Sequence, residues 1–430
     1  MNIKQALFHN TGWKIITLLF TFVNNIIIVR LLGAEASASF FYAIAVFTLL
    51  STVLRFGLEN SIIFYASKDS KLTGPLALFL AVAGLIQAVL SYAALHYFIP
   101  EAGPYTLPWI IVFIVSNVFI FYATAFYQVK RMYISVNIAA AVTALLQTAV
   151  LAVFYFSKNN FMLSRGFAKN MNDAVLIVLA AAALFQVLLL MLWFYRQNKA
   201  ALIGRLPDAG TVKNVFRYSA VNFTGTVLMF LIMRADFYFV EKYCSGIVLA
   251  NYVQVAKIGQ MALIFPGLLG GVIFPYTVNA PASFAEKISF FCRMLTGIFV
   301  SAAVVFIVAG KSIFIWLLGA DFYLVYPGIC GTFAGIYFLG INLILISYFE
   351  GRNQQKIVLL SNLISLFIVI ATDYFLVPVY GMMAAAIVFS AANFAGMLVL
   401  AGYFITQTGT RAKELFLPRR ADSFVFRFWK

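Results

Sequence analysis

The chain alternates between long apolar stretches and short polar connections from Trp13 to Ile405. Most stretches approach the roughly 20 residues that a helix needs to cross a hydrocarbon core of about 30 Å. The pattern predicts an all-α, polytopic membrane fold with about twelve transmembrane helices. The predicted spans are residues 12–32, 40–65, 74–98, 107–127, 133–156, 174–195, 218–240, 247–275, 288–309, 325–349, 356–377 and 381–405.

The composition indicates that lipid is the solvent of this chain. Of its 430 residues, 63% are hydrophobic and only 10% are charged. A protein of this composition would expose more apolar surface than water tolerates. In a membrane protein, the formal net charge of +16 is interpreted from the side of the bilayer on which each basic residue lies. It does not predict a nucleic-acid partner.

The distribution of Lys and Arg predicts the orientation of the spans. With a cytoplasmic N-terminus, 21 basic residues fall on the cytoplasmic side, 6 on the opposite side and 3 at membrane depth. Lys158, Arg165 and Lys169 cluster on the outer side and argue against this orientation, but the totals favour it. The positive-inside rule predicts that both termini are cytoplasmic.

The middle of the chain carries a basic connection from Arg196 to Arg217. We interpret it as the linker between a six-helix half at residues 1–200 and a second one at 201–406, followed by a basic-aromatic cytoplasmic tail at 407–430. Two six-helix halves around a central cavity are typical of a duplicated transporter that works by alternating access. An even division also arises by chance in membrane proteins.

The sequence has no motif that predicts a metal site, a cofactor site or a catalytic site. Cys244, Cys292 and Cys330 fall in separate segments without the spacing of a zinc site or a redox pair. Gly310-Lys311-Ser312 looks like the end of a phosphate-binding loop, but Val305 stands where that motif requires glycine. The predicted outer loops are also short, so no extramembranous catalytic domain is expected. We predict a protein that is not an enzyme and has no cofactor.

Several short stretches share the order and spacing of a known family. They are Asn10-Thr11-Gly12-Trp13-Lys14, Arg30-Leu31-Leu32-Gly33, Phe56-Gly57-Leu58, Asp236, Asn251-Tyr252, residues 316–322 and residues 377–386. Together they resemble the polysaccharide and oligosaccharide flippases of the multidrug/oligosaccharidyl-lipid/polysaccharide exporter (MOP) superfamily, the group that includes bacterial O-antigen flippases. The likeness runs over nearly the whole chain.

This resemblance implies a function. It implies a multi-pass protein of the bacterial inner membrane that flips a polyprenyl-pyrophosphate-linked oligosaccharide, an O-antigen or exopolysaccharide unit. A polysaccharide polymerase and other assembly proteins are the partners that it implies. Two alternatives stay open: a drug or small-solute antiporter of the same superfamily, and a non-transporting scaffold of a polysaccharide assembly complex.

Three basic residues lie at predicted membrane depth, namely Arg55, Arg234 and Lys257. Lys257 lies roughly 15 Å into its span, near the midplane, where a charge costs about 3 kcal/mol or more. We predict that these residues form a cationic cavity for the pyrophosphate of the cargo. The alternative for each is a structural ion pair.

Acidic and amide side chains are the predicted partners of these cations. Asp236 either pairs with Lys257 or binds a coupling H⁺ or Na⁺ together with Asn362. Glu59 stands four residues after Arg55, so the two are expected to touch on one helix face. Asp373 lies shortly before Pro378 and is expected to be solvated near the outer interface.

Overall fold

The structure is a computed structural model that describes residues 3–98, 106–130, 132–157, 170–197, 206–279, 285–352 and 354–417. Helices make up all the regular secondary structure of these residues. Twelve helical segments are long and apolar enough to cross a membrane. The predicted all-α polytopic fold with twelve spans is therefore confirmed.

The chain divides into two compact units, Met1–Val227 and Leu228–Lys430. The first contains α1 (Ile3–Leu32), α2 (Ala34–Arg55), α3 (Leu58–Lys68), η1 (Ser70–Leu72), α4 (Thr73–Phe98), α5 (Leu107–Val129), α6 (Tyr133–Ser157) and α8 (Met171–Gln197). The boundary between the units falls within α9 (Ala209–Ile232). The predicted division into six-helix halves at 1–200 and 201–406 stays a prediction. Of the predicted tail at 407–430, residues 418–430 lie outside the described residues.

The second unit continues with shorter helices before its long ones. Its elements are α10 (Ala235–Tyr243), α11 (Gly246–Ala262), α12 (Ile264–Asn279), α13 (Ala285–Leu318), η3 (Ala320–Phe322), α14 (Val325–Gly351), α15 (Gln355–Tyr380), α16 (Met382–Thr408) and α17 (Ala412–Phe416).

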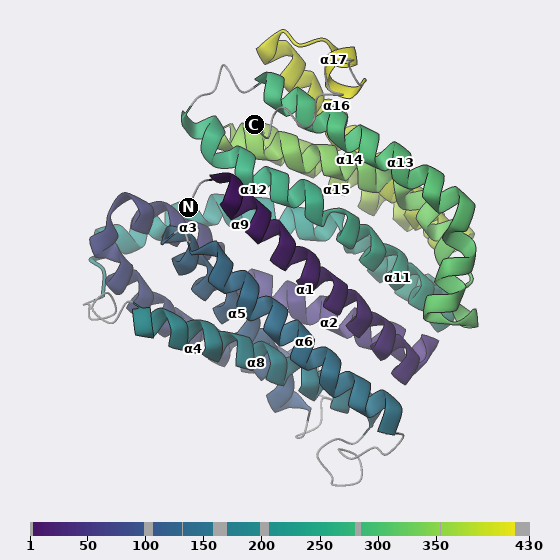
Figure 1. Ribbon diagram of the computed structural model, residues 1–430, viewed down its shortest axis with the longest axis horizontal. Helices are drawn as coiled ribbons and strands as arrows, with labels where there is room; N and C mark the ends of the chain where they lie inside the picture. Colours follow the sequence, from purple (N-terminus) through teal and green to yellow (C-terminus); the bar gives the residue numbers. More distant parts are fainter. Residues whose placement is uncertain are drawn as a thin grey trace. The chain divides into compact units, whose positions relative to one another are not determined.

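Each unit is built around one central helix. In the first unit α2, α3, α4 and α8 pack on α5, and α1 packs along α6 (Figure 1). In the second unit α11, α12, α13 and α16 pack on α14. Close approach of α14 and α16 depends on Gly335, where a Cβ atom would lie 2.7 Å from the Cα of Ser390. The Ser390 hydroxyl accepts from the Gly335 N–H at 3.0 Å and donates to the Gly331 carbonyl at 2.7 Å.

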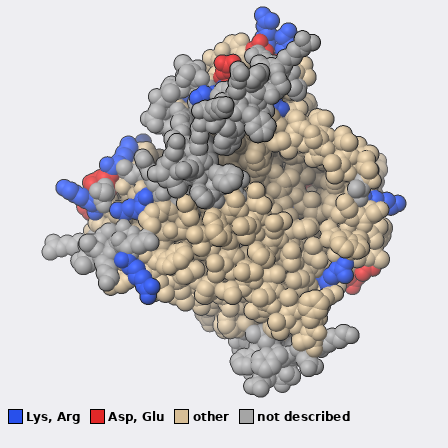
Figure 2. Space-filling model, viewed as in Figure 1, with Lys and Arg blue, Asp and Glu red and all other residues tan. Residues whose placement is uncertain are grey.

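The flanks of the helices expose large apolar side chains, such as Val308 (82%) and Phe367 (73%). Figure 2 shows charged side chains near helix ends, while the helix flanks on this face are uncharged. Such a surface is stable only against a hydrocarbon solvent. The exposed flanks therefore support the assignment of the helices to a membrane.

Three predicted spans are interrupted, which the hydropathy pattern did not indicate. The span 40–65 is divided into α2 and α3 at Phe56-Gly57, and the span 218–240 into α9 and α10 at Met233-Arg234. The span 247–275 is divided at Leu263. The predicted spans gave no position for these breaks, because hydropathy does not report backbone geometry.

The break at Phe56-Gly57 has left-handed backbone geometry, with φ of 50° at Phe56 and 65° at Gly57. It packs closely on α9, since a Cβ atom on Gly57 would lie 3.0 Å from the carbonyl oxygen of Ser219 and 3.1 Å from the nitrogen of Phe223. The Phe56 and Phe223 rings lie 4.8 Å apart. Glycine is therefore required at position 57.

We expect Gly57→Ala to lower the free energy of unfolding by about 1–3 kcal/mol, because alanine is strained at this φ and its Cβ meets backbone atoms. The matched control is Gly225→Ala in α9, where a Cβ atom would have no neighbour within 4 Å. Thermal unfolding of the purified protein in detergent measures both variants. An unchanged midpoint for Gly57→Ala would contradict the described break.

Candidate functional site

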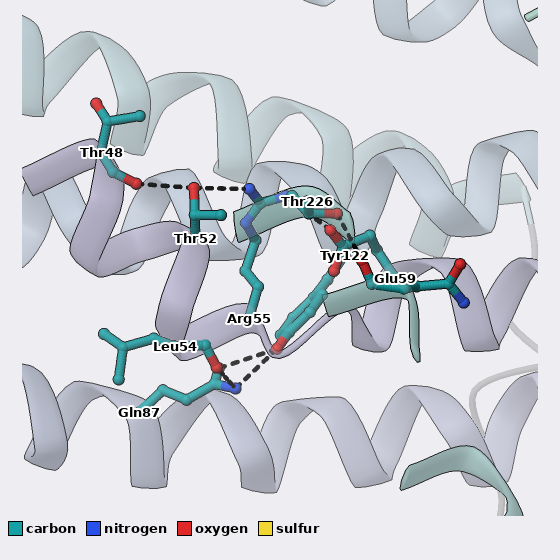
Figure 3. Close-up of polar contacts among 9 residues, drawn as sticks. Thr48, Thr52, Leu54, Arg55, Glu59, Gln87, Tyr122 and Thr226 are labelled. Carbon is teal, nitrogen blue, oxygen red and sulfur yellow. Dashed lines mark hydrogen bonds and ion pairs between the residues drawn. The ribbon is translucent and has the colours of Figure 1, made fainter. Parts of the chain in front are cut away.

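Polar side chains gather at two of the helix breaks, one in each unit. At the first break, α2 ends at Arg55 and α3 begins at Leu58. The Arg55 Nη1 atom donates to Glu59 Oε1 at 2.8 Å, and its Nη2 atom donates to Thr52 Oγ1 at 3.1 Å (Figure 3). The expected contact of Arg55 with Glu59 is confirmed, but it joins two helices across a break rather than one helix face.

The Arg55–Glu59 pair is buried against aromatic and amide groups. The guanidinium carbon of Arg55 lies 3.6 Å from the ring centroid of Phe121, a favourable cation–π distance. Arg55 Nε and Glu59 Oε2 are buried without a hydrogen-bond partner. The Nε donor of Arg55 and the Oε2 acceptor of Glu59 are therefore unused, although almost no solvent reaches them.

A glutamine from α4 compensates for the backbone bond that the break removes. The Gln87 amide nitrogen donates to the Leu54 carbonyl at 2.7 Å, and it also lies 2.8 Å from the Tyr122 hydroxyl (Figure 3). Tyr122 donates to Gln87 Oε1 at 3.1 Å. A carbonyl without a partner is costly in hydrocarbon, so Gln87 is a structural requirement of the interrupted helix.

The second break holds the carboxylate of Asp236 in the first turn of α10, which begins at Ala235. Tyr252 of α11 donates its hydroxyl proton to Asp236 Oδ2, and the Phe237 N–H donates to Asp236 Oδ1 at 2.9 Å. Arg234 precedes the helix, and its guanidinium carbon lies 4.6 Å from the Phe237 ring centroid. Asp236 is thus fixed by hydrogen bonds and by the positive end of a helix dipole.

Asp373 is placed differently from its predicted position. It was expected in water, but its side chain is fully buried (0% exposed) and both carboxyl oxygens lack a hydrogen-bond partner. The reason is that α15 continues through Pro378 to Tyr380, so the proline does not mark the end of the span. Asp373 also lies within electrostatic range of Asp236 and Tyr252.

The remaining predicted site residues of the second unit are Lys257, Arg234 and Asn362, and they differ in burial and in neighbours. Lys257 is half-buried on α11, close enough to Arg234 for the two positive charges to repel each other. The Nη1 atom of Arg234 is buried without a hydrogen-bond partner. Asn362 is buried on α15 (6% exposed), but the described hydrogen-bond donors to Asp236 are Tyr252 and Phe237.

A pocket opens beside Asp236 within the second unit. Its apolar wall is formed by Met233, Val255, Leu263, Ile336 and Phe389, among others. Asp236, Tyr252, Gln260 and Thr332 also line it. Reasoning from sequence missed Tyr252 and Gln87 as site residues, because a polar side chain inside an apolar span does not show which neighbour it will contact.

Structural comparison finds similar folds over nearly the whole chain. An inward-facing multidrug resistance MATE transporter of the MOP superfamily has a TM-score of 0.68 at 12% identity, over 92% of this chain and 96% of its own. A mutant of the MATE transporter VcmN from Vibrio cholerae has a TM-score of 0.67 at 13% identity, over 94% and 97%. The lipid II flippase MurJ, in its inward closed conformation, has 0.67 at 13% identity, over 94% and 89%.

The chain has the fold of MATE transporters and of MurJ. No protein-family model and no curated protein sequence matches it. At these identities the likeness concerns the fold, and it agrees with the superfamily that the sequence motifs resemble. Because the similar structures include drug transporters and a lipid flippase, the fold alone favours neither cargo.

We expect Glu59→Gln to lower the free energy of unfolding by about 3 kcal/mol, because it leaves the Arg55 charge buried without a counter-charge. The single variant Arg55→Met and the double variant Arg55→Met with Glu59→Gln complete the cycle, and the double variant, which removes both charges, should recover most of that loss. A double-mutant cycle of thermal midpoints in detergent measures the coupling. Additive effects of the two single changes would show that the pair contributes no coupling energy.

Proposed function

We propose that this chain is a cation-coupled flippase that moves a polyprenyl-pyrophosphate-linked oligosaccharide, an O-antigen or exopolysaccharide unit, across the bacterial inner membrane by alternating access. The observation that carries the proposal is the neighbouring pair Arg234 and Lys257, with Arg234 Nη1 buried and lacking a hydrogen-bond partner. Neighbouring positive charges repel in a low-dielectric site, and an anion between them relieves that repulsion.

Pyrophosphate matches the donors of this site. It carries several acceptor oxygens, and a guanidinium group binds phosphate oxygens through paired, charge-assisted hydrogen bonds. Within the first unit, Arg55 already donates to Glu59 and Thr52 through its two terminal nitrogens. The sugar and pyrophosphate would travel in the protein, while the polyprenyl chain stays in lipid.

Coupling to an ion gradient is assigned to Asp236 and Asp373. Two buried carboxyl groups within electrostatic range of each other resist being ionised together unless a positive charge compensates them. Asp373 has two carboxyl oxygens without hydrogen-bond partners, which are available to a coupling H⁺ or Na⁺. Uptake and release of that ion would accompany the conformational cycle.

The pocket beside Asp236 supports a second candidate function. Its apolar wall and single carboxylate have the chemistry that a lipophilic cation, the cargo expected of a drug antiporter, would need, and the pocket would have to widen to admit one. A non-transporting scaffold for a polymerase and other assembly proteins is the third candidate. The first candidate requires a positive charge at position 257, whereas the other two do not.

We expect Lys257→Ala, as the only copy in cells, to reduce surface polysaccharide by about 10-fold or more, because a lost contact to a charged cargo group costs roughly 1.5–3 kcal/mol. The lipid-linked precursor should accumulate in the inner leaflet. Precursor extraction, surface polysaccharide and the amount of membrane-inserted protein are measured together.

Two control variants accompany this experiment. Lys257→Arg keeps the charge and should retain most export, and Lys242→Ala removes an exposed lysine of the same unit and should have no effect. Normal export by Lys257→Ala at normal protein level would remove Lys257 from the mechanism. Extrusion of lipophilic cations by the same cells would favour the antiporter.

A further inference from the structure

Asn251 joins three elements of the second unit at the end where α11 begins. Its amide nitrogen donates to the Asp321 carbonyl at 2.9 Å and to the Ile247 carbonyl of its own helix at 2.8 Å. Its side-chain oxygen accepts the N–H of Leu324 at 3.0 Å. The Asn251 side chain is fully buried. Asn251 therefore binds α11 both to η3 and to the residue that immediately precedes α14.

The groups that Asn251 binds outside α11 are backbone groups at a helix end. The first N–H groups of a helix have no partner within the helix, and Leu324 lies directly before α14. Asp321 belongs to η3, a 3₁₀ helix of three residues. A buried polar group that loses its hydrogen bond is costly. We therefore expect α11 to separate from η3 only when water reaches these groups.

Beyond this contact, α11 and α14 pack closely side by side. A Cβ atom on Gly328 would lie 2.6 Å from Cγ2 of Val255, so the Val255 side chain lies directly against the backbone of α14. Asn251 and Val255 are four residues apart, which places them on one face of α11. The face of α11 that packs on α14 therefore begins at Asn251.

The pocket beside Asp236 lies further along the same two helices. Residues of α11 and α14 form much of its lining, namely Val255, Ala256, Gly259, Gln260, Thr332 and Ile336. Thr332 is only 5% exposed, so the pocket is narrow at this wall. Movement of α11 away from α14 would widen the pocket, and the hydrogen bonds of Asn251 oppose that movement.

We propose that Asn251 is a latch that keeps this pocket narrow: α11 moves away from α14 only after the bonds from Asn251 to Asp321 and Leu324 break. Asn251 is a positioning residue, because it acts on the pocket through α11 and is not part of the lining. Release of the latch is the step that would let the pocket admit a ligand. The inference goes beyond the proposed cargo, since widening of the pocket is measurable without cargo or an ion gradient.

The test is the rate at which a water-soluble maleimide labels a Thr332→Cys variant of the purified full-length protein. Cys244→Ser and Cys330→Ser are added, and the buried Cys292 is kept as an internal control. Labelling at position 332 should be slow while Asn251 is in place. Asn251→Leu has a similar volume but cannot form the three hydrogen bonds, and it should raise the labelling rate at position 332 by about 10-fold or more.

Two further variants make the measurement specific. Asn251→Asp keeps the acceptor for the Leu324 N–H and loses the amide donors, so it should give a smaller rise, and it also serves if Asn251→Leu does not fold. Asn222→Leu is the matched control, because Asn222 of α9 donates to the Tyr218 carbonyl of its own helix at 3.1 Å. It should leave the labelling rate at position 332 unchanged.

An unchanged labelling rate at position 332 in folded Asn251→Leu or Asn251→Asp protein would overturn the inference. Equal acceleration of labelling at Cys292 would also overturn it, because Asn251 would then stabilise the whole unit and not the pocket. These outcomes concern the latch alone. Failure of the proposed flippase function appears separately, as normal precursor levels in Lys257→Ala cells.

Discussion

The satisfaction of backbone hydrogen bonds in lipid is the constraint on which the rest of this structure depends. A continuous helix satisfies its own backbone, and an interrupted one requires partners from other groups. At the first break Gln87 of α4 binds the free carbonyl of Leu54. At the second break the Asp236 carboxylate accepts the N–H of Phe237 in the first turn of α10. The polar clusters of both units therefore exist where the helices are broken.

The same constraint explains why charged residues are found at these places. A charge inside an apolar span is costly unless it faces water, a counter-charge or a ligand. Arg55 has Glu59, Thr52 and the Phe121 ring, which together enclose it. In the second unit, Asp236 attracts Arg234, and Lys257 lies within electrostatic range of the same guanidinium group. Under the proposed function, these are the charges that an anionic cargo group would meet.

The sequence alone was sufficient for the fold class, because span length and apolar composition are visible in any window of about 20 residues. It was not sufficient for the breaks at Phe56-Gly57 and Met233-Arg234, because the charged residues beside them do not report the geometry of the backbone. The prediction that Asp373 lies in water was wrong, because α15 continues through Pro378 to Tyr380. The contact of Arg55 with Glu59 was predictable from spacing, while the contact of Tyr252 with Asp236 depends on how α10 and α11 pack. Residues close in sequence were thus predictable as partners, and residues brought together by packing were not.

The central claim is that the cargo is an anionic lipid-linked sugar. The most direct measurement reconstitutes the purified protein into vesicles with a fluorescent polyprenyl-pyrophosphate-linked oligosaccharide and follows its accessibility to a membrane-impermeant quencher. The account predicts protein-dependent movement between leaflets that is accelerated by an ion gradient and competed by inorganic pyrophosphate. No movement above that of empty vesicles, together with uptake of a lipophilic cation by the same vesicles, would contradict it.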